Sequence, residues 1–149
     1  MSRATVRCPS CGIEVDKYRN PFPTVDLILM DQAGSGVYLV ERKNPPPGWA
    51  LPGGFVEWGE SLEDAARREG EEETSLVVEL SGQFRAYGDP DRDPRFHTIT
   101  VVFAAHGAGE ARGRDDARSA RFFRWDELPE RMAFDHRRIL EEFRRSVLC

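Results

Sequence analysis

The sequence has few cysteines, few lysines and no long apolar run, and these shortages exclude several classes of protein. Three cysteines in 149 residues are too few for a disulfide scaffold. No stretch approaches the roughly eighteen apolar residues of a membrane-spanning helix, and residues 1–10 lack the apolar segment of a signal peptide. A formal net charge of −5 provides no basic surface for non-specific nucleic-acid binding. We therefore expect a cytoplasmic protein that binds neither membranes nor nucleic acid.

What the sequence does contain is sufficient for one hydrophobic core. Hydrophobic residues make up 40% of the chain and aromatic residues 10%, which argues against disorder. Lys17 and Lys43 are the only lysines, so nearly all positive charge is arginine, whose planar side chain suits phosphate and carboxylate groups. The length favours a single domain. We expect a short leader over residues 1–20 and one domain over residues 21–149.

Hydrophobic patterns and turn signals predict strands together with two helices. Strands are expected at residues 25–30, 37–42, 77–80, 84–87, 97–105 and 121–125. One helix begins at Ser61, which has capping-box spacing to Asp64, and runs to about Glu73. Asp135 is expected to cap a last helix. Because these elements do not alternate strictly as strand and helix, the fold class is α/β (α+β).

The helix predicted over residues 61–73 carries carboxylates where a core-facing stripe would be apolar. Counted from Leu62 at about 100° per residue, three glutamates share the side of its apolar residues: Glu69, Glu72 and Glu73. Crowding unpaired anions together is costly. A hard divalent cation removes that cost because it prefers oxygen ligands and brings its own charge.

Two interpretations of this helix remain open. A solvated, glutamate-rich helix pairs its charges at i, i+4, as Arg68 would with Glu72. In a metal site, by contrast, residues 53–54 are glycines that let the backbone approach the helix and leave carbonyl oxygens free as ligands. Arg68 would then clamp Glu60 and Glu69 and fix the orientation of the ligands.

Residues 54–76 resemble the box of the Nudix hydrolase family, G-x5-E-x7-R-E-U-x-E-E-x-G-U, in which U is a bulky aliphatic residue. Every charged position is present, and the matching residues are Gly54, Glu60, Arg68, Glu69, Glu72, Glu73 and Leu76. Two positions depart from the box, since Gly70 replaces an aliphatic residue and Ser75 replaces the usual glycine. Both departures concern the packing and the end of the helix rather than metal ligation.

The resemblance implies a Nudix α/β/α sandwich in which a mixed, curved sheet lies between helices. It implies metal-dependent hydrolysis of a nucleoside diphosphate linked to another group, in which a metal-activated water attacks phosphorus. The residues that it implies as ligands of Mg²⁺ or Mn²⁺ are Glu69, Glu72, Glu73 and the carbonyl oxygen of Gly54. It also implies Arg68 and Glu60 as the supporting ion pair of the catalytic group.

Looser motifs outside the box are similar to the ADP-ribose pyrophosphatase branch of the family. They lie at residues 21–26, 41–46, 49–56, 88–100 and 115–117. The similarity implies ADP-ribose or a related nucleoside diphosphate derivative as the substrate, and a homodimer as the assembly. Within these motifs, Arg42 and Arg95 are candidate contacts to phosphate or ribose, with surface salt bridges as the alternative. Phe96 is a candidate to stack on adenine, with core packing as the alternative.

The general base and the exact substrate are left open by the sequence. The base is expected among Glu110, Asp115, Asp116 and the glutamates of the box. An alternative activity is cleavage of nucleoside triphosphates, including oxidised ones, to a monophosphate and pyrophosphate. A third alternative, a non-catalytic nucleotide-sensing module, is disfavoured because a sensor does not need the metal-binding glutamates.

The leader carries the sequence Cys8-Pro9-Ser10-Cys11-Gly12, which resembles the first knuckle of a zinc ribbon. A closed zinc site needs four ligands, and the sequence has no second C-x-x-C. We favour a degenerate knuckle with reduced thiols at Cys8 and Cys11. The alternatives are a four-thiolate zinc site shared by two chains and a zinc ion completed by distant residues.

Overall fold

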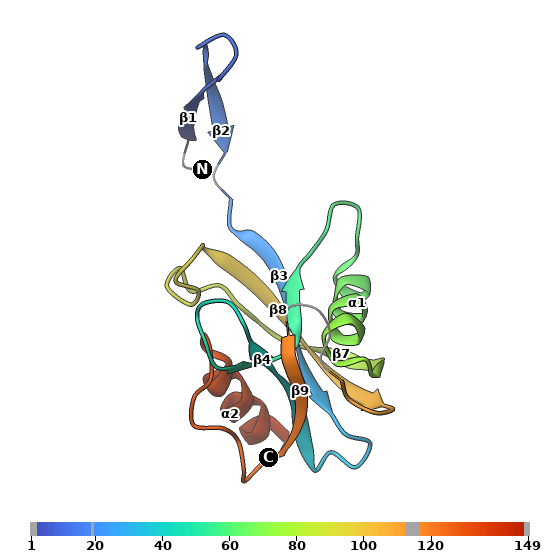
Figure 1. The fold of residues 1–149 in the computed structure, drawn as a ribbon. Coiled ribbons are helices and arrows are strands. Elements are labelled where there is room, and N and C mark those ends of the chain that lie inside the picture. The colour runs from blue at the N-terminus through green and yellow to red at the C-terminus, as the bar shows by residue number, and fades with distance from the viewer. Residues whose placement is uncertain (1–2, 19, 113–116, 148–149) are drawn as a thin grey trace.

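The computed structural model describes residues 3–18, 20–112 and 117–147 and combines strands with helices (Figure 1). The strands are β1 (Arg3–Arg7), β2 (Glu14–Tyr18), β3 (Phe22–Met30), β4 (Gly36–Arg42), β5 (Trp49–Ala50), β6 (Gly53–Phe55), β7 (Val77–Tyr87), β8 (Thr98–Ala108) and β9 (Ala117–Arg124). The helices are α1 (Leu62–Thr74) and α2 (His136–Val147). Among the described residues, neither helix has the length and apolarity needed to cross a membrane.

A mixed sheet forms the body of the domain, with β3 at its centre. β3 runs parallel to β8 from the pair Phe22↔Thr98 to the pair Met30↔His106, and antiparallel to β4 and β6. β7 and β9 extend the sheet beyond β8 and β4, respectively. The mixed α/β fold expected from the sequence is therefore confirmed.

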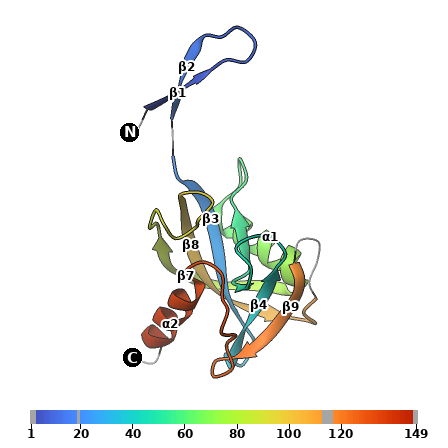
Figure 2. The ribbon, with the colours of Figure 1, turned by 60° about the vertical axis from the view of Figure 1, so that its left-hand side comes forward.

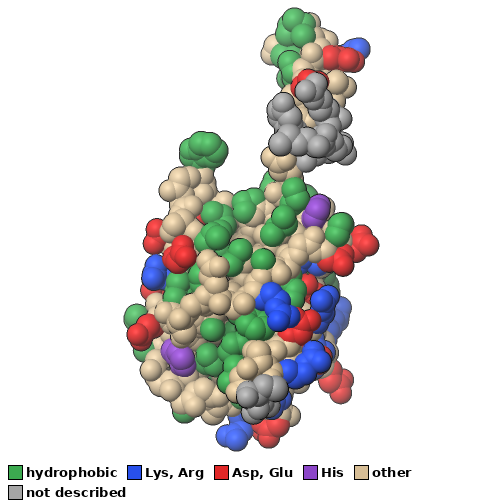
Figure 3. All heavy atoms as spheres, turned by 180° about the vertical axis from the view of Figure 1, so that it is seen from behind, with side chains coloured by type: hydrophobic (Ala, Val, Ile, Leu, Met, Phe, Trp, Pro, Cys, Tyr) green, Lys and Arg blue, Asp and Glu red, His purple; other side chains and the backbone are tan. Residues whose placement is uncertain are grey.

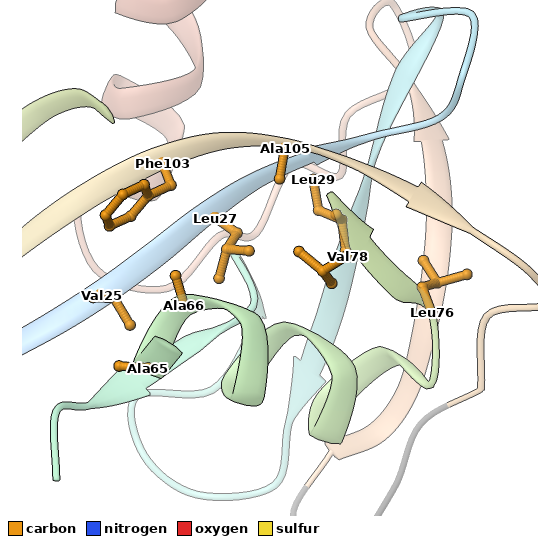
Figure 4. Close-up of a cluster of buried hydrophobic side chains, with 9 residues drawn as sticks. All are labelled: Val25, Leu27, Leu29, Ala65, Ala66, Leu76, Val78, Phe103 and Ala105. Atoms are coloured by element: carbon orange, nitrogen blue, oxygen red, sulfur yellow. The ribbon is translucent and has the colours of Figure 1, made fainter. Parts of the chain in front are cut away.

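The two helices pack on opposite faces of this sheet, because successive side chains of β3 point to opposite sides. Val25, Leu27 and Leu29 pack with α1 in one buried cluster, shown in Figure 4. Ile28, the residue between two of them, packs on the other side against Ile139 of α2 and its neighbours. Figure 2 shows the sheet between the two helices. Helix α1, which carries most residues of the box, therefore packs directly against the central strand β3.

Two strands predicted at residues 77–80 and 84–87 form the single strand β7. It pairs with β8 along its whole length, and its register shifts between Leu80 and Gly82 and again between Gln83 and Arg85. These bulges interrupt the alternation of polar and apolar residues, which is why the sequence pattern indicates two strands. The short leader expected over residues 1–20 includes the β1–β2 hairpin.

Helix α1 begins and ends where its sequence predicts. Ser61 caps the helix, since its Oγ accepts a hydrogen bond from the Asp64 backbone N–H at 3.1 Å. Gly70 is buried, and a Cβ at this position would lie 2.9 Å from Val78 Cγ2 and 3.2 Å from Leu27 Cδ2. Glycine at this position of the box therefore lets α1 lie close to the sheet.

The end of α1 provides a stability prediction. Ser75 has left-handed backbone angles (φ 61°, ψ 12°) that favour glycine, and its Oγ donates only an exposed hydrogen bond to the Arg112 carbonyl at 3.1 Å. We expect Ser75→Gly to stabilise the protein by about 0.5–1 kcal/mol. Thermal unfolding should show this as a rise in Tm of a few degrees. Ser81→Gly, within strand β7, is the control and should lower the Tm.

Candidate active site

Glu69 lies against the loop that leads into α1. Gly54 of β6 pairs with Val25 of β3, so β6 is held beside the central strand. A Cβ at Gly54 would collide with the carboxylate of Glu69. A larger residue at this position would therefore displace the Glu69 carboxylate from its present place. Burial is the main reason that the pKa of Glu69 is raised.

Glu73 lies one helical turn further along and is fixed by the same loop. Its Oε2 accepts a hydrogen bond from the Gly53 backbone N–H at 3.0 Å. Burial, together with the neighbouring carboxylates of Glu69 and Asp26, raises the pKa of Glu73 to about 8 against that one stabilising hydrogen bond. The ionised carboxylate is disfavoured in this environment, because the Gly53 hydrogen bond and the charge of Arg42 offset only part of the cost of burial.

Arg68 connects the charged residues of the box. Its guanidinium donates to both carboxylate oxygens of Glu60, at 2.8 and 2.9 Å, and to Glu69 Oε1 at 2.8 Å. Glu72 Oε2 lies at 3.4 Å from the same group, and the Phe55 carbonyl oxygen at 3.1 Å. These hydrogen bonds from Arg68 are the main reason that the pKa of Glu60 is lowered to about 2. The Arg68–Glu60 pair has the bidentate geometry typical of strong ion pairs.

A cleft of about 400 Å³ opens beside these residues. Its lining comes from β4, the loop after β4, β6 and its following loop, α1 and the loop before β8, and consists of Val40, Glu41, Arg42, Lys43, Asn44, Gly53, Gly54, Phe55, Glu57, Glu69, Glu73 and Arg95. The structure therefore brings the predicted residues Arg42 and Arg95 into one cleft with Glu69 and Glu73. Glu72 is not part of this lining, and its side chain is 62% exposed.

The two arginines line the cleft, where Arg42 donates to a backbone carbonyl oxygen and Arg95 pairs with a carboxylate. Arg42 donates from Nε to the Pro46 carbonyl oxygen at 2.9 Å, and its guanidinium lies 4.7 Å from the centre of the Phe134 ring. Arg95 binds Asp93 through two hydrogen bonds of 2.8 and 3.0 Å and lies 5.3 Å from the same ring. Burial and then repulsion from Arg95 lower the pKa of Arg42. Two guanidinium groups held this way favour a bound anion.

The other predicted residues lie outside this lining or outside the described residues. Phe96 is 47% exposed and packs edge-to-face with Phe22, the ring centres being 5.6 Å apart. Glu110, a candidate base, is exposed and forms an ion pair with Arg112. The other two candidates, at 115 and 116, lie outside the described residues.

A buried ionic cluster beneath the cleft was missed by the sequence analysis. Asp26 of β3 accepts a hydrogen bond from Thr100 Oγ1 at 2.6 Å and lies 3.6 Å from Arg92, which also binds Asp135 at 2.8 Å. Burial raises the pKa of Asp26 to about 6. Asp135, the expected cap, immediately precedes α2, and its backbone carbonyl oxygen accepts a hydrogen bond from the Ile139 N–H at 3.1 Å. Its carboxylate binds Arg92. The one available signal was an aspartate inside the otherwise apolar run 25–30.

His136, at the start of α2, completes this cluster as a neutral side chain. Its Nδ1 accepts a hydrogen bond from the Leu51 backbone N–H at 2.9 Å, and Nε2 lies 3.5 Å from Asp26 Oδ1. Burial and the positive charge of Arg92 lower the pKa of His136 to about 3. The cluster joins β3, the loop before β8 and α2 under the segment that carries Gly53 and Gly54, and so supports the floor of the cleft.

The donor groups in the cleft fit a hard divalent cation. Mg²⁺ is usually held by one or two carboxylates, with waters and substrate phosphates completing its shell, and Glu69 and Glu73 provide two carboxylates of raised pKa. Across the described ranges 3–18, 20–112 and 117–147, no three His, Cys, Asp or Glu side chains form a preassembled metal cluster. A site shared with phosphate oxygens is consistent with both observations.

Comparisons with known proteins agree with this geometry. The sequence profile of the NUDIX domain matches residues 20–143. The chain is 41% identical over 138 residues to the ADP-ribose pyrophosphatase of Methanocaldococcus jannaschii, a match that covers 89% of this chain and 80% of that protein. It is 36% identical over 94 residues to the ADPR responsive transcriptional repressor NtrR of Acinetobacter baylyi, covering 59% of this chain and 38% of the repressor.

The fold is also similar to that of a solved structure with a bound ligand. The NUDIX domain of Shewanella oneidensis NrtR, complexed with ADP ribose, superposes with a TM-score of 0.73. The two sequences are 27% identical, and the match covers 87% of this chain and 90% of that domain.

Proposed function

The chain belongs to the NUDIX family, and on that premise we propose that it is a metal-dependent hydrolase that cleaves the diphosphate of ADP-ribose or a related nucleoside diphosphate derivative. The observation that carries this proposal is the cleft in which Arg42 and Arg95 face Glu69 and Glu73. Guanidinium groups bind phosphate oxygens directly, whereas carboxylates need a cation between themselves and a phosphate. The similarity to the archaeal pyrophosphatase supports the same substrate class.

The proposed metal ligands are the three helical glutamates and the Gly54 carbonyl oxygen, with Mg²⁺ or Mn²⁺ as the ion. When bound, such an ion neutralises phosphate charge and lowers the pKa of a coordinated water. Arg68 orients Glu69 and Glu60 by its hydrogen bonds. The Gly53 N–H fixes the direction of the Glu73 carboxylate. The chain thus holds its carboxylates in place before substrate binds, which reduces the entropy lost on binding.

The remaining roles are proposed from the sequence, and for the two arginines their position in the cleft supports the proposal. Arg42 and Arg95 hold the phosphates or ribose of the substrate, and Phe96 stays a candidate contact to the adenine. The general base is proposed among Glu110, Asp115, Asp116 and the box glutamates. Glu57, which lines the cleft, joins these candidates.

The protein is further proposed to act in the cytoplasm on small molecules. Its net charge of −5 provides no attraction for the phosphates of DNA or RNA.

A substrate panel with product identification tests the proposed activity. ADP-ribose, other nucleoside diphosphate sugars and normal or oxidised nucleoside triphosphates are supplied with saturating Mg²⁺ or Mn²⁺. We expect AMP and a phosphosugar from ADP-ribose, and no turnover in EDTA. Release of pyrophosphate from triphosphates alone would identify the alternative activity. Tight binding of ADP-ribose without turnover would indicate a sensor.

Replacing Arg42 tests its proposed contact with the substrate. Arg42→Gln removes a charge-assisted hydrogen-bond donor worth about 1.5–3 kcal/mol, so we expect KM for ADP-ribose to rise tenfold to a hundredfold with a much smaller change in kcat. Steady-state kinetics at saturating metal measure both parameters. Arg124→Gln is the control, because Arg124 is exposed, forms an ion pair with Asp126 and lies outside the cleft lining. An unchanged KM in Arg42→Gln would place the substrate elsewhere.

A further inference from the structure

The amino-terminal hairpin stands apart from the body of the domain and from the cleft. β1 and β2 form a two-stranded sheet of their own, from the pair Arg3↔Tyr18 to the pair Arg7↔Glu14. Figures 1 and 2 show this hairpin extending away from the main sheet. An isolated two-stranded hairpin is only marginally stable in water. An additional interaction is therefore needed to hold it in one conformation.

Two free thiols lie at the tip of this hairpin. The Cys8 N–H donates to the Ile13 carbonyl oxygen at 2.9 Å, and the Gly12 N–H donates to the Cys8 carbonyl oxygen at 2.9 Å. Gly12 has a φ of 73°, which allows the tight turn. This turn places two cysteines, three residues apart, at the same end of the hairpin. Two cysteines at this spacing can bind one metal ion as thiolates.

Two exposed valines lie next to the tip on one face of the hairpin. Val6 and Val15 are directly opposite each other, so their side chains share a face, and they are 42% and 50% exposed. Arg7 and Glu14 form the next pair, and their side chains make an exposed ion pair at 3.8 Å. Figure 3 shows hydrophobic side chains on the surface of the protruding hairpin. A second molecule bound at the tip would lie next to these two valines.

We propose that the hairpin binds one Zn²⁺ shared with a second copy of the chain, Cys8 and Cys11 of each copy supplying the four ligands. A structural zinc site is tetrahedral and closed, and four thiolates form one of its common ligand sets. Each chain supplies two neighbouring thiols, and a two-fold axis through the metal makes both halves equivalent. Within the described part of the chain, no further His, Cys, Asp or Glu completes a cluster of three at this turn.

The same arrangement gives the exposed valines a partner surface. We expect Val6 and Val15, which pair in the strands next to the tip, to become less exposed in the dimer. The binding energy of zinc then stabilises both the hairpin and the dimer, because a shared site does not exist in one chain alone. Removal of zinc should therefore destabilise the hairpin and weaken dimerisation. It should leave the cleft unchanged, because no residue of the hairpin lines the cleft.

Zinc stoichiometry and association state of the full chain test the proposal. Protein produced with zinc and then dialysed is analysed for metal content and, by light scattering, for mass. We expect about one zinc per two chains in a dimer. Stripping the zinc with a chelator should weaken association at least about tenfold, because an ion that binds only the dimer must strengthen it. Cobalt loading should give the intense visible bands of a tetrahedral thiolate site.

Cysteine variants locate the site. Cys8→Ser and Cys11→Ser should each lose the zinc and the zinc-dependent association, while their hydrolysis of ADP-ribose at saturating Mg²⁺ should match that of the original protein, since neither residue lines the cleft. Cys149→Ser, which removes the third cysteine, is the matched control and should keep the zinc. Both results together assign the metal to the hairpin.

Several outcomes overturn the proposal. One zinc per chain in a monomer shows a site completed within the chain, and loss of zinc from Cys149→Ser shows that the third cysteine is a ligand. No bound zinc, with a Cys8–Cys11 disulfide in its place, shows a redox pair instead. If the dimer association constant does not change when zinc is removed, zinc does not link the two chains.

Discussion

Replacing Glu73 by glutamine is expected to lower kcat by about a hundredfold or more while making the metal-free protein more stable. The substitution removes the negative charge of a proposed metal ligand, and weaker metal binding accounts for the lost turnover. It keeps an oxygen that can accept the hydrogen bond from the Gly53 N–H. It also removes the cost of ionising a carboxyl group that the fold buries, which accounts for the gain in stability.

The pH dependence of that gain has a definite sign. The pKa of Glu73 rises from 4.5 to about 8 on folding, so the folded original protein binds the extra proton and loses stability as pH rises through this window. Glu73→Gln has no such loss. In EDTA, the stability difference between the two should therefore be near zero at pH 4.5 and grow to about 2–4 kcal/mol at pH 8.

Denaturant unfolding over this pH range, with kinetics at saturating Mg²⁺, measures both effects. Glu71→Gln is the matched control, because Glu71 is an exposed glutamate on the same helix outside the cleft lining. We expect it to retain activity and to change stability by less than about 0.5 kcal/mol. Unchanged turnover in Glu73→Gln, or a stability difference that does not vary with pH, would contradict the proposed role of Glu73.

Replacing Arg92 by methionine is expected to cost about 3–5 kcal/mol of folding stability. The Arg92 side chain is 4% exposed and donates hydrogen bonds to Asp135 and Thr98 at 2.8 and 3.0 Å. Without the guanidinium group of Arg92, the carboxylates of Asp26 and Asp135 lose the positive charge that neutralises them. The loss should be larger at pH 8 than at pH 5, because Asp26, whose pKa is already raised, takes up a proton at the lower pH.

Calorimetry or denaturant unfolding at both pH values tests this expectation. Adding Asp135→Asn to Arg92→Met should restore part of the stability, since it removes one of the unpaired charges. Arg85→Met removes an exposed arginine that binds Glu142, and as a control it should cost less than about 1 kcal/mol. Equal losses in the two arginine variants would show that burial of the ionic cluster contributes little.

The box helix was predictable from sequence because its signals are local. Ser61 and Asp64 mark its beginning, Ser75 its end, and the spacing of Arg68 from Glu60 brings their side chains together. The signals at the two ends of α1 are local to the helix, whereas Glu60 precedes the helix and meets Arg68 from the turn that it forms with Glu57.

The rest of the site depends on contacts between distant parts of the chain. Asp26, Arg92 and Asp135 meet only after β3, the loop before β8 and α2 have assembled, and no local pattern indicates which charges will pair. The exposure of Phe96 and the position of Arg42 beside Phe134 likewise follow from the packing of separate loops. The bulges of β7 conceal one long strand for a similar reason, since its pairing with β8 determines where it runs.

The central position of β3 also determines the order in which the molecule can assemble during synthesis. β3 leaves the ribosome early, but its parallel neighbour β8 follows only after α1 and β7 have been made. Non-local parallel pairing is intrinsically slow. The glutamate-bearing helix therefore emerges before the strand that completes its platform, and a chain that stops before residue 98 cannot build the site.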